Sequence, residues 1–281
     1  MKFLPTTKEE MKNLGWDSID VLLISGDTYL DTSYNGSALV GKWLVEHGFK
    51  VGIIAQPEVD VPDDITRLGE PNLFFAISGG CVDSMVANYT ATKKRRQQDD
   101  FTPGGENNKR PDRAVLVYSN MVRRFFKGTT KKIVISGIES SLRRITHYDY
   151  WTNKLRKPIL FDAKADILSY GMGEMSMLQL ATALKNGEDW QNIRGLCYLS
   201  KEAKEEYLSL PSHSECLADK DKFIEAFHTF YLNCDPITAK GLCQKCDDRY
   251  LIQNPPSESY SEEIMDKIYA MEFARDVHPY Y

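Results

Sequence analysis

Side chains that can bind or react are concentrated in residues 132–151, which read KIVISGIESSLRRITHYDYW. The stretch begins with β-branched residues typical of a short strand (133–135) and turns at Ser136-Gly137. A dense set of polar and aromatic residues follows: Glu139, Arg143, Arg144, His147, Tyr148, Asp149, Tyr150 and Trp151. This order is typical of a ligand crevice at the carboxyl edge of an open α/β sheet. It also fits one more core strand whose aromatic residues pack against a neighbouring domain.

Glycines at the ends of other predicted strands are the second set of candidate binding residues. They are found in Gly26-Asp27, Gly79-Gly80, Gly137 and Gly171-Met172-Gly173. In a parallel sheet these turns would meet along one edge, where backbone amides and helix N-termini can bind a phosphate or another polar ligand. The alternative is that they only make the tight turns that α/β proteins need. Gly171-x-Gly173 followed by Ser176 is an incomplete GxGxxG, so a dinucleotide fingerprint is not favoured.

Short apolar runs alternate with helical periodicity over the first two thirds of the chain. The predicted strands are residues 20–25, 50–55, 73–78, 133–135, 165–170 and 193–199. Helical spacing of apolar residues occurs between them, for example in residues 39–44, 114–125 and 177–184. Strands separated by helices predict an α/β domain with a doubly wound, mostly parallel, Rossmann-like sheet over residues 1–199.

Residues 200–281 have a different character. Ser212 and Glu215 match a capping box, and apolar spacing over 223–231 predicts an amphipathic helix. Ser261 would cap a last helix, with a short strand at 250–253 before it. We expect an α-rich extension that packs against the sheet or connects it to another domain.

Residues 91–113 (ATKKRRQQDDFTPGGENNKRPDR) interrupt the alternation. They are polar and lack apolar periodicity, which predicts a long loop that is either functional or disordered. The basic run 93–96 could meet an anion, but Asp99 and Asp100 follow directly, and a solvated basic surface is the preferred interpretation.

Composition narrows the class of protein. The 281 residues are 42% apolar and 27% charged, as in ordinary globular proteins, and the net charge of −5 gives no general attraction to nucleic acid. No apolar run is long enough to span a membrane, and the start of the chain does not read as a signal peptide. Six dispersed cysteines indicate reduced thiols, so we expect a cytoplasmic protein.

Cys243-x2-Cys246 is the one spacing that resembles a metal site. A structural zinc ion needs four ligands, usually from two such pairs, and the remaining candidates (Cys216, Cys234, His213 and His228) lack paired spacing. A redox pair is a second possibility. Two free thiols are preferred over both, and no metal ligand or catalytic residue is assigned.

Several phrases distributed along the chain resemble one known family. They are FLPTTKEEMKNLGWDSIDVLLISGDTYLD, VGIIAQP, LGEPNLFFAISGG, DSMVANYTA, TPGG, KRPDRA, GIESSLRRITHYDYW and RYLIQNPP. Together they resemble the N-terminal region of YgiQ-type radical SAM proteins, and SLRRITHYDYW is the most specific of them. The resemblance extends from Phe3 to about Pro279. It implies that a radical SAM barrel follows, in which a C-x3-C-x2-C motif holds a 4Fe-4S cluster that binds S-adenosylmethionine.

This chain has no C-x3-C-x2-C spacing. A cluster with one open iron needs three thiolates on a tight loop, so we expect no cofactor in this chain and no radical chemistry from it alone. The resemblance therefore implies a truncated member that needs the missing C-terminal barrel, in the same or an adjacent chain, as its partner. The substrate, small or macromolecular, is not specified by these residues.

The family's N-terminal domain is similar in architecture to cobalamin-binding domains, which carry a D-x-H-x-x-G loop whose histidine ligates cobalt. The matching residues here are Asp31-Thr32-Ser33-Tyr34-Asn35-Gly36. Ser33 replaces the histidine, which excludes cobalt ligation from this loop. Corrin binding without that ligand stays open but unsupported.

Two hypotheses follow. The chain is either the accessory domain of a radical SAM enzyme, whose crevice faces the barrel and helps to hold substrate, or a stand-alone Rossmann-like module that binds a nucleotide or a corrin-like ligand. In the first hypothesis the crevice is lined by Arg143, Arg144, Tyr148, Asp149 and Trp151, whereas the glycine-ended strands support the second. The full set of candidate ligand-binding residues is Gly26, Asp27, Asp31, Gly79, Gly80, Gly137, Glu139, Arg143, Arg144, His147, Tyr148, Asp149, Trp151, Gly171 and Gly173.

Overall fold

The computed structural model describes residues 1–281 and divides into two compact units. Unit 1 comprises residues 1–139 and 260–281, and unit 2 comprises residues 140–259. The division expected after residue 199 falls instead inside unit 2. There β8 (Leu196–Ser200) pairs with β11 (Arg249–Gln253), which joins the segments on either side of that position.

Unit 1 contains four parallel strands in the order β2-β1-β3-β4. They are β1 (Val21–Ser25), β2 (Val51–Ala55), β3 (Phe74–Ser78) and β4 (Lys132–Ser136). All residues of β1 and β2 are buried, and so are the central residues of β3 and β4. Such continuous burial requires cover on both faces of the sheet, which explains their nearly unbroken apolar sequences. The α/β fold expected from the sequence is confirmed.

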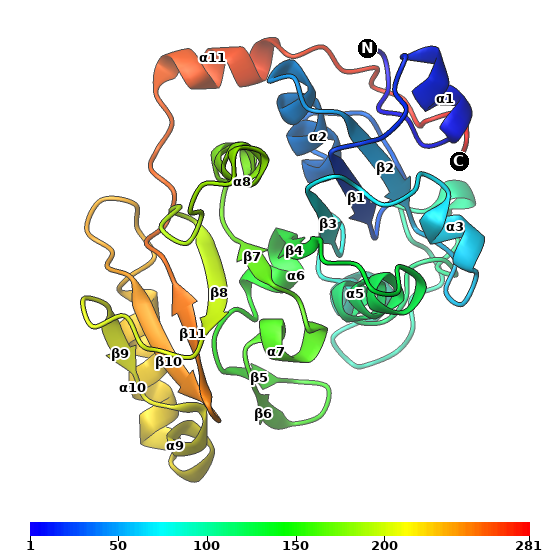
Figure 1. Ribbon diagram of the computed structural model, residues 1–281. Coiled ribbons are helices and arrows are strands. Elements are labelled where there is room, and N and C mark those ends of the chain that lie inside the picture. Colours follow the sequence, from blue (N-terminus) through cyan, green and yellow to red (C-terminus); the bar gives the residue numbers. More distant parts are fainter. The chain divides into compact units, whose positions relative to one another are not determined.

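Helical elements accompany this sheet in unit 1, and some of them lie on its two faces (Figure 1). They are α1 (Lys8–Asn13), α2 (Gly36–Glu46), α3 (Pro62–Thr66), α4 (Ser84–Asn88), the 3-10 turn η1 (Pro103–Gly105), α5 (Ala114–Phe125), α6 (Gly137–Ser141, which reaches into unit 2) and α11 (Glu262–Ala270). Helix α2 packs on β1 and β2, whereas α3 and α5 contact each other and α5 packs on β3. Right-handed crossovers place α2 opposite α3 and α5, because the strand order reverses at β1.

The end of the chain returns to unit 1. The backbone N–H of Arg275 donates to the carbonyl of Asp31 at 2.8 Å, and the Tyr281 hydroxyl accepts from the N–H of Ala55 at 2.7 Å. Nε2 of His278 lies 2.9 Å from a carboxylate oxygen of Glu10 in α1. These contacts hold both termini at the same part of unit 1, as Figure 1 shows.

Unit 2 contains the strand order β7-β8-β11-β10-β9 and a separate hairpin, β5-β6. Its further elements are β5 (His147–Asp149), β6 (Lys154–Arg156), α7 (Ile159–Ala163), β7 (Ile167–Ser169), α8 (Glu174–Asn186), β9 (Leu208–Leu210), α9 (His213–Ala218), α10 (Lys220–Tyr231) and β10 (Leu242–Cys246). The sixth predicted strand, β8, was expected to be parallel and is antiparallel to β7. An apolar run indicates burial but not strand direction, and antiparallel strands are common beside parallel ones. The segment 200–281, predicted to be α-rich, also contains the three strands β9, β10 and β11.

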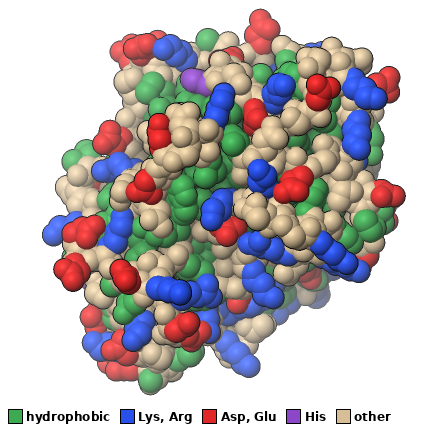
Figure 2. Space-filling view, in the orientation of Figure 1, with side chains coloured by type: hydrophobic (Ala, Val, Ile, Leu, Met, Phe, Trp, Pro, Cys, Tyr) green, Lys and Arg blue, Asp and Glu red, His purple; other side chains and the backbone are tan.

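None of the helices is both long enough and apolar enough to cross a bilayer. On the face shown in Figure 2, acidic and basic side chains are interspersed. This mixture agrees with the small net charge of −5.

Candidate functional site

The carboxyl ends of β1 and β3 form the topological switch point of unit 1. Strand β1 pairs with β2 on one side and with β3 on the other, so the crossovers on the two sides diverge here. Open α/β sheets bind ligands at such points. Gly26-Asp27 and Gly79-Gly80, both predicted as binding residues, follow these two strands and lie together in the structure.

Close approach of neighbouring atoms explains why glycine occupies positions 26 and 80. The N–H of Gly26 donates to the carbonyl of Ser78 at 2.9 Å, and a Cβ on Gly26 would lie 2.2 Å from the carbonyl oxygen of Gly79. Gly80 has a φ of +111°, and a Cβ there would lie 2.1 Å from a carboxylate oxygen of Asp27. The space beside these glycines is therefore filled by the protein itself.

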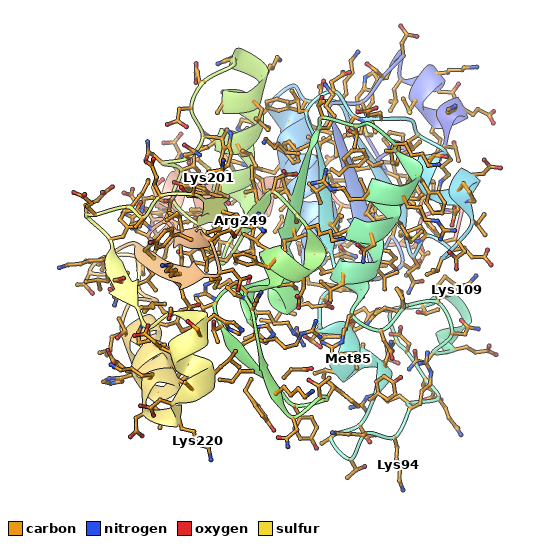
Figure 3. All side chains as sticks on the ribbon, turned by 60° about the horizontal axis from the view of Figure 1, so that its bottom comes forward. Met85, Lys94, Lys109, Lys201, Lys220 and Arg249 are labelled. Carbon is orange, nitrogen blue, oxygen red and sulfur yellow. The ribbon has the colours of Figure 1, made fainter.

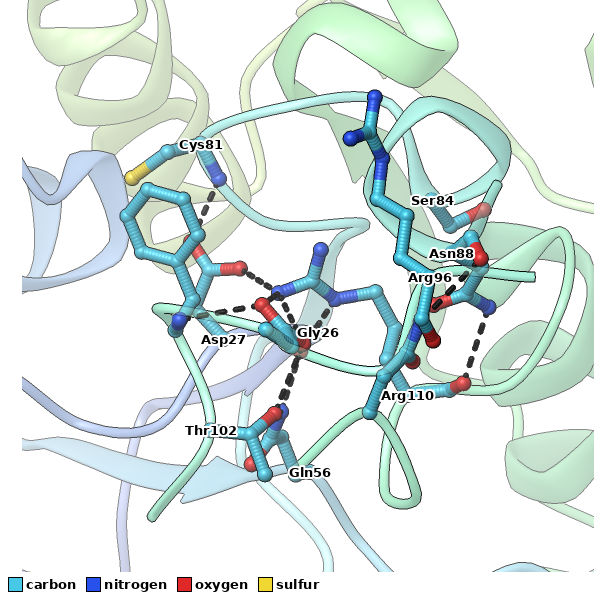
Figure 4. A network of polar contacts seen from close by, with 12 residues as sticks. Gly26, Asp27, Gln56, Cys81, Ser84, Asn88, Arg96, Thr102 and Arg110 are labelled. Carbon is cyan, nitrogen blue, oxygen red and sulfur yellow. Dashed lines mark hydrogen bonds and ion pairs between the residues drawn. The ribbon is translucent and has the colours of Figure 1, made fainter. Parts of the chain in front are cut away.

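Asp27 and Arg110 form a buried ion pair at this edge (Figure 4). Their side chains are 1% and 0% exposed, and Nη2 of Arg110 lies 2.6 Å from Oδ1 of Asp27. The other oxygen of Asp27 accepts from the N–H of Cys81 at 2.6 Å, and Nε of Arg110 donates to the carbonyl of Gly26 at 2.9 Å. Burial raises the pKa of Asp27, although the positive charge of Arg110 opposes that shift.

Gln56, which directly follows β2, and residues of the segment 91–113 complete the network. Nε2 of Gln56 donates to the carbonyl of Gly26 at 3.0 Å and to Oγ1 of Thr102 at 2.7 Å. Thr102 donates to Asp99 at 2.8 Å, and Asp99 lies 3.2 Å from Arg110. Gln56 has a φ of +44°, a conformation that non-glycine residues seldom adopt, and its two amide hydrogen bonds hold it there.

The polar segment 91–113 is therefore folded over the sheet edge through its buried side chains. Its basic run 93–96 is exposed, as expected, and Figure 3 shows Lys94 and Lys109 at the outside of this segment. Arg110, the adjacent residue, is fully buried. Sequence reasoning missed Arg110, Asp99, Thr102 and Gln56, because a buried polar network leaves no periodic signal in the sequence.

Glu139 occupies the position where a bound anion is expected. Its two carboxylate oxygens accept from the N–H of Ser84 at 3.0 Å and from the N–H of Val115 at 3.2 Å. Ser84 begins α4 and Val115 lies in the first turn of α5, so this carboxylate caps two helix N-termini. A Cβ on Gly79 would lie 2.4 Å from Glu139. The protein thus supplies its own anion at this edge.

Asp31 binds other parts of unit 1. Its carboxylate is fully buried and accepts from Lys42 at 2.7 Å, from the Tyr29 hydroxyl at 3.0 Å and from the N–H of Ala274 at 2.6 Å. Ser33, at the histidine position of the cobalamin loop, is exposed. This loop has no cobalt ligand and is attached to the C-terminal segment, so its residues do not fit an axially ligated cobalamin.

Two polar atoms at the switch point have no hydrogen-bond partner. They are Nη1 of Arg110 and Oγ1 of Thr28, and both are buried. Cys81, whose N–H donates to Asp27, is half-buried, and burial together with the Asp27 carboxylate raises the pKa of its thiol to about 12. The thiol is therefore protonated at neutral pH, which does not suit a nucleophile.

The remaining predicted residues belong to unit 2. Arg144 lies between two aromatic rings, with its guanidinium carbon 4.5 Å from the ring centre of Tyr170 and 4.3 Å from that of Phe230. Its Nε donates to Gln253 at 3.0 Å. These contacts give Arg144 a role in packing.

Asp149 and Tyr148 sit in the β5-β6 hairpin. Asp149 is buried and accepts from the hydroxyl of Thr152 at 2.6 Å, whereas Tyr148 is half exposed. Trp151 packs edge-on against Tyr150, with 6.0 Å between ring centres. Gly171 and Gly173 precede α8, and Gly173 is its N-cap residue. The predicted set is thus divided between the two units: Gly26 to Glu139 lie in unit 1, and Arg143 to Gly173 lie in unit 2.

His147 is the one predicted residue with a large pKa shift towards lower values. The pKa of His147 is lowered to about 4, mainly by burial and also by the charges of Arg143 and Arg156, while a 3.1 Å hydrogen bond between Nδ1 and the carbonyl of Ile145 partly opposes the shift. The imidazole is neutral at physiological pH.

This shift predicts a pH-dependent stability. Because the folded pKa lies below the unfolded value of about 6.5, the stabilising contribution of neutral His147 is present above that value and lost as the pH falls towards 4. We expect a loss of about 2 kcal/mol from this group at pH ~5. Urea unfolding at pH ~7 and ~5 should show a smaller loss for His147→Gln than for the wild type. An imidazole that titrates by NMR near the unfolded value would contradict this prediction.

The cysteines do not fit an iron–sulfur cluster or a zinc site. The structure contains six free thiols and no group of three or more His, Cys, Asp or Glu side chains placed to hold a metal ion. Cys243 and Cys246 are both buried in β10. Burial raises the pKa of Cys246 to about 12, which favours the protonated thiol over a metal-binding thiolate.

Comparison with known proteins assigns the family. The family model described as "Radical SAM N-terminal" matches residues 3–281. The chain belongs to the Radical SAM N-terminal family. This confirms the resemblance seen in the sequence.

Curated relatives that match this chain with high identity include longer proteins. A UPF0313 protein of Fusobacterium nucleatum is 96% identical over all 281 residues, which cover 50% of its length. A UPF0313 protein of Thermotoga neapolitana is 50% identical over 99% of this chain and 49% of its own length. The chain spans about half the length of the curated relatives that it matches.

A solved structure of the radical S-adenosylmethionine methyltransferase TsrM from Kitasatospora setae, with cobalamin and a [4Fe-4S] cluster bound, is more distant from this Radical SAM N-terminal chain. It is 16% identical, with a TM-score of 0.43, over 64% of this chain and 27% of its own.

Proposed function

We propose that this chain is the accessory domain of a radical SAM enzyme, and that the carboxyl edge of its unit 1 sheet helps to form a substrate pocket with the second half of the full-length protein. The observation that carries the proposal is the family match over residues 3–281 in a chain half as long as its relatives. The cluster and the cleavage of S-adenosylmethionine would belong to the other half, since the cysteines here do not fit a cluster. A cytoplasmic location stays a prediction.

The surface of the edge supports this role. Tyr34, Val86 and Ile138 follow β1, β3 and β4 respectively, and they are 64%, 59% and 42% exposed. Tyr34 lies in the loop after β1, Val86 in α4 and Ile138 in α6, so one loop and two short helices present exposed apolar side chains after these strands. Apolar side chains that gather at a sheet edge indicate a surface covered by another part of the protein.

The proposal is tested by joining residues 1–281 to the second half of the Fusobacterium relative. Both this extended chain and the 281-residue chain are reconstituted anaerobically with iron and sulfide, and 5′-deoxyadenosine formation from S-adenosylmethionine is measured. We expect cleavage only from the extended chain. Cleavage of S-adenosylmethionine by the 281-residue chain alone would contradict the proposal that the cluster and the cleavage belong to the second half.

The pocket is tested in the extended chain. Replacement of Tyr34, Val86 and Ile138 by lysine should lower the turnover of a substrate, once one is found. The same changes should have little effect on the cleavage of S-adenosylmethionine measured in the absence of that substrate. The three side chains are exposed, so the fold should tolerate the changes. Equal loss of both activities would place these residues outside the pocket.

A stand-alone nucleotide- or corrin-binding module is the alternative. The carboxylate of Glu139 already caps the helix N-termini where a phosphate would bind, and Ser33 supplies no cobalt ligand. We therefore expect no change in the melting temperature of the 281-residue chain with nucleotides, S-adenosylmethionine or cobalamin. A saturable stabilisation by one of them would favour the alternative.

A further inference from the structure

Helix α10 of unit 2 is apolar on two sides. Phe230 is partly buried and packs on Arg144, and Ala226 is buried, which defines the inner side. Ile224, Phe227 and Tyr231 lie on the outer side and are 61%, 54% and 66% exposed. Their spacing of three and four residues places them along one stripe of the helix.

Further exposed apolar residues lie close to α10 in the sequence or in the helix that packs against it. Leu217 lies in α9, which packs against α10, and Leu232 and Ile237 follow the end of α10. All three are more than half exposed. We name the six residues the α10 stripe: Leu217, Ile224, Phe227, Tyr231, Leu232 and Ile237.

Such a stripe is unfavourable in water. Surface helices normally carry apolar residues on one side only, and helices that are apolar on all sides are buried. Isolated exposed apolar residues need no explanation, but a contiguous group marks a contact surface. Because Ala226 and Phe230 already bury the inner side, the outer stripe is available to a different partner.

We propose that the α10 stripe is the docking surface for the second half of the full-length protein. The Fusobacterium relative matches every residue of this chain at 96% identity and contains as much protein again. In the complete protein, the remaining half is therefore covalently tethered to this chain at high effective concentration. The inference rests on family membership and on this length, and not on the sheet edge being a substrate pocket.

Side-chain footprinting tests this docking. The probe is a photoactivated carbene reagent, applied to the 281-residue chain and to the extended chain that carries the second half of the Fusobacterium relative. We expect labelling of Phe227 and Tyr231 to be about threefold or more lower in the extended chain, because docked side chains lose most of their solvent contact. Unchanged labelling would overturn the proposal.

A charged variant supplies a second measurement. Ile224→Glu should leave the melting temperature of the 281-residue chain unchanged, because this side chain is 61% exposed, and restore the labelling of Tyr231 in the extended chain. The matched control is Tyr269→Glu on α11, another exposed aromatic residue, at 76%. If the 281-residue chain dimerises and protects the stripe by itself, a second copy is the partner and the proposal fails. Footprinting does not depend on catalysis. Its result therefore tests the docking surface even if the sheet edge of unit 1 does not form a substrate pocket.

Discussion

Gly26→Ala should destabilise the protein by about 3 kcal/mol or more, because the added methyl group would overlap backbone atoms that cannot move without disrupting the sheet. The new Cβ would lie 2.2 Å from the carbonyl oxygen of Gly79 and 2.6 Å from its carbon. Relief requires separation of β1 from β3, and with it loss of the hydrogen bond from Gly26 to Ser78. Soluble yield and the midpoint of urea unfolding measure the effect.

Gly36→Ala is the matched control. Gly36 is the first residue of α2, and a Cβ there would meet no atom within 4 Å. Alanine also favours the helix over glycine by up to about 1 kcal/mol, so this variant should equal or exceed the wild type. If both variants behave alike, the close approach at the switch point is not a constraint on the fold.

Arg110→Met is expected to cost about 3–5 kcal/mol, the usual loss when one member of a buried ion pair is removed. The substitution leaves the carboxylates of Asp27 and Asp99, which are 1% and 2% exposed, without their cation. It also removes the hydrogen bond to the carbonyl of Gly26. Urea unfolding of the variant beside Lys109→Met measures the cost. Lys109 is the exposed neighbour, and its replacement should have almost no effect.

The pH dependence of that loss identifies its cause. Burial already raises the pKa of Asp27, and without Arg110 that pKa rises further. A carboxyl group with a raised pKa contributes stability below its unfolded pKa and loses it as the pH rises through the folded value. The deficit of Arg110→Met should therefore grow between pH ~5 and ~8. A deficit independent of pH would instead indicate lost packing.

These two variants address the rigidity of the proposed pocket. A crevice that positions substrate needs fixed walls, because small displacements of a binding group reduce catalysis strongly. The Asp27–Arg110 pair and the Glu139 cap hold three loops and two helices at one edge. Their buried charges stabilise that edge, while the exposed side chains around it are free to contact a partner.

Much of the fold of unit 1 was predictable from the sequence alone, because the signals are local. Continuous apolar runs specified β1 to β4, the glycines specified the turns that follow them, and the sequence phrases specified the family. The missing C-x3-C-x2-C motif is also readable without a structure. Each of these depends on residues that are close together in the chain.

The site was decided by the tertiary structure. Arg110 is separated by more than 80 positions from Asp27, and Glu139 by more than 50 from Ser84, so no spacing rule connects them. The direction of β8 and the attachment of Asp31 to Ala274 also depend on the path of the whole chain. Buried polar groups take whichever partner the packed backbone brings within hydrogen-bond distance, and only the folded chain determines that choice.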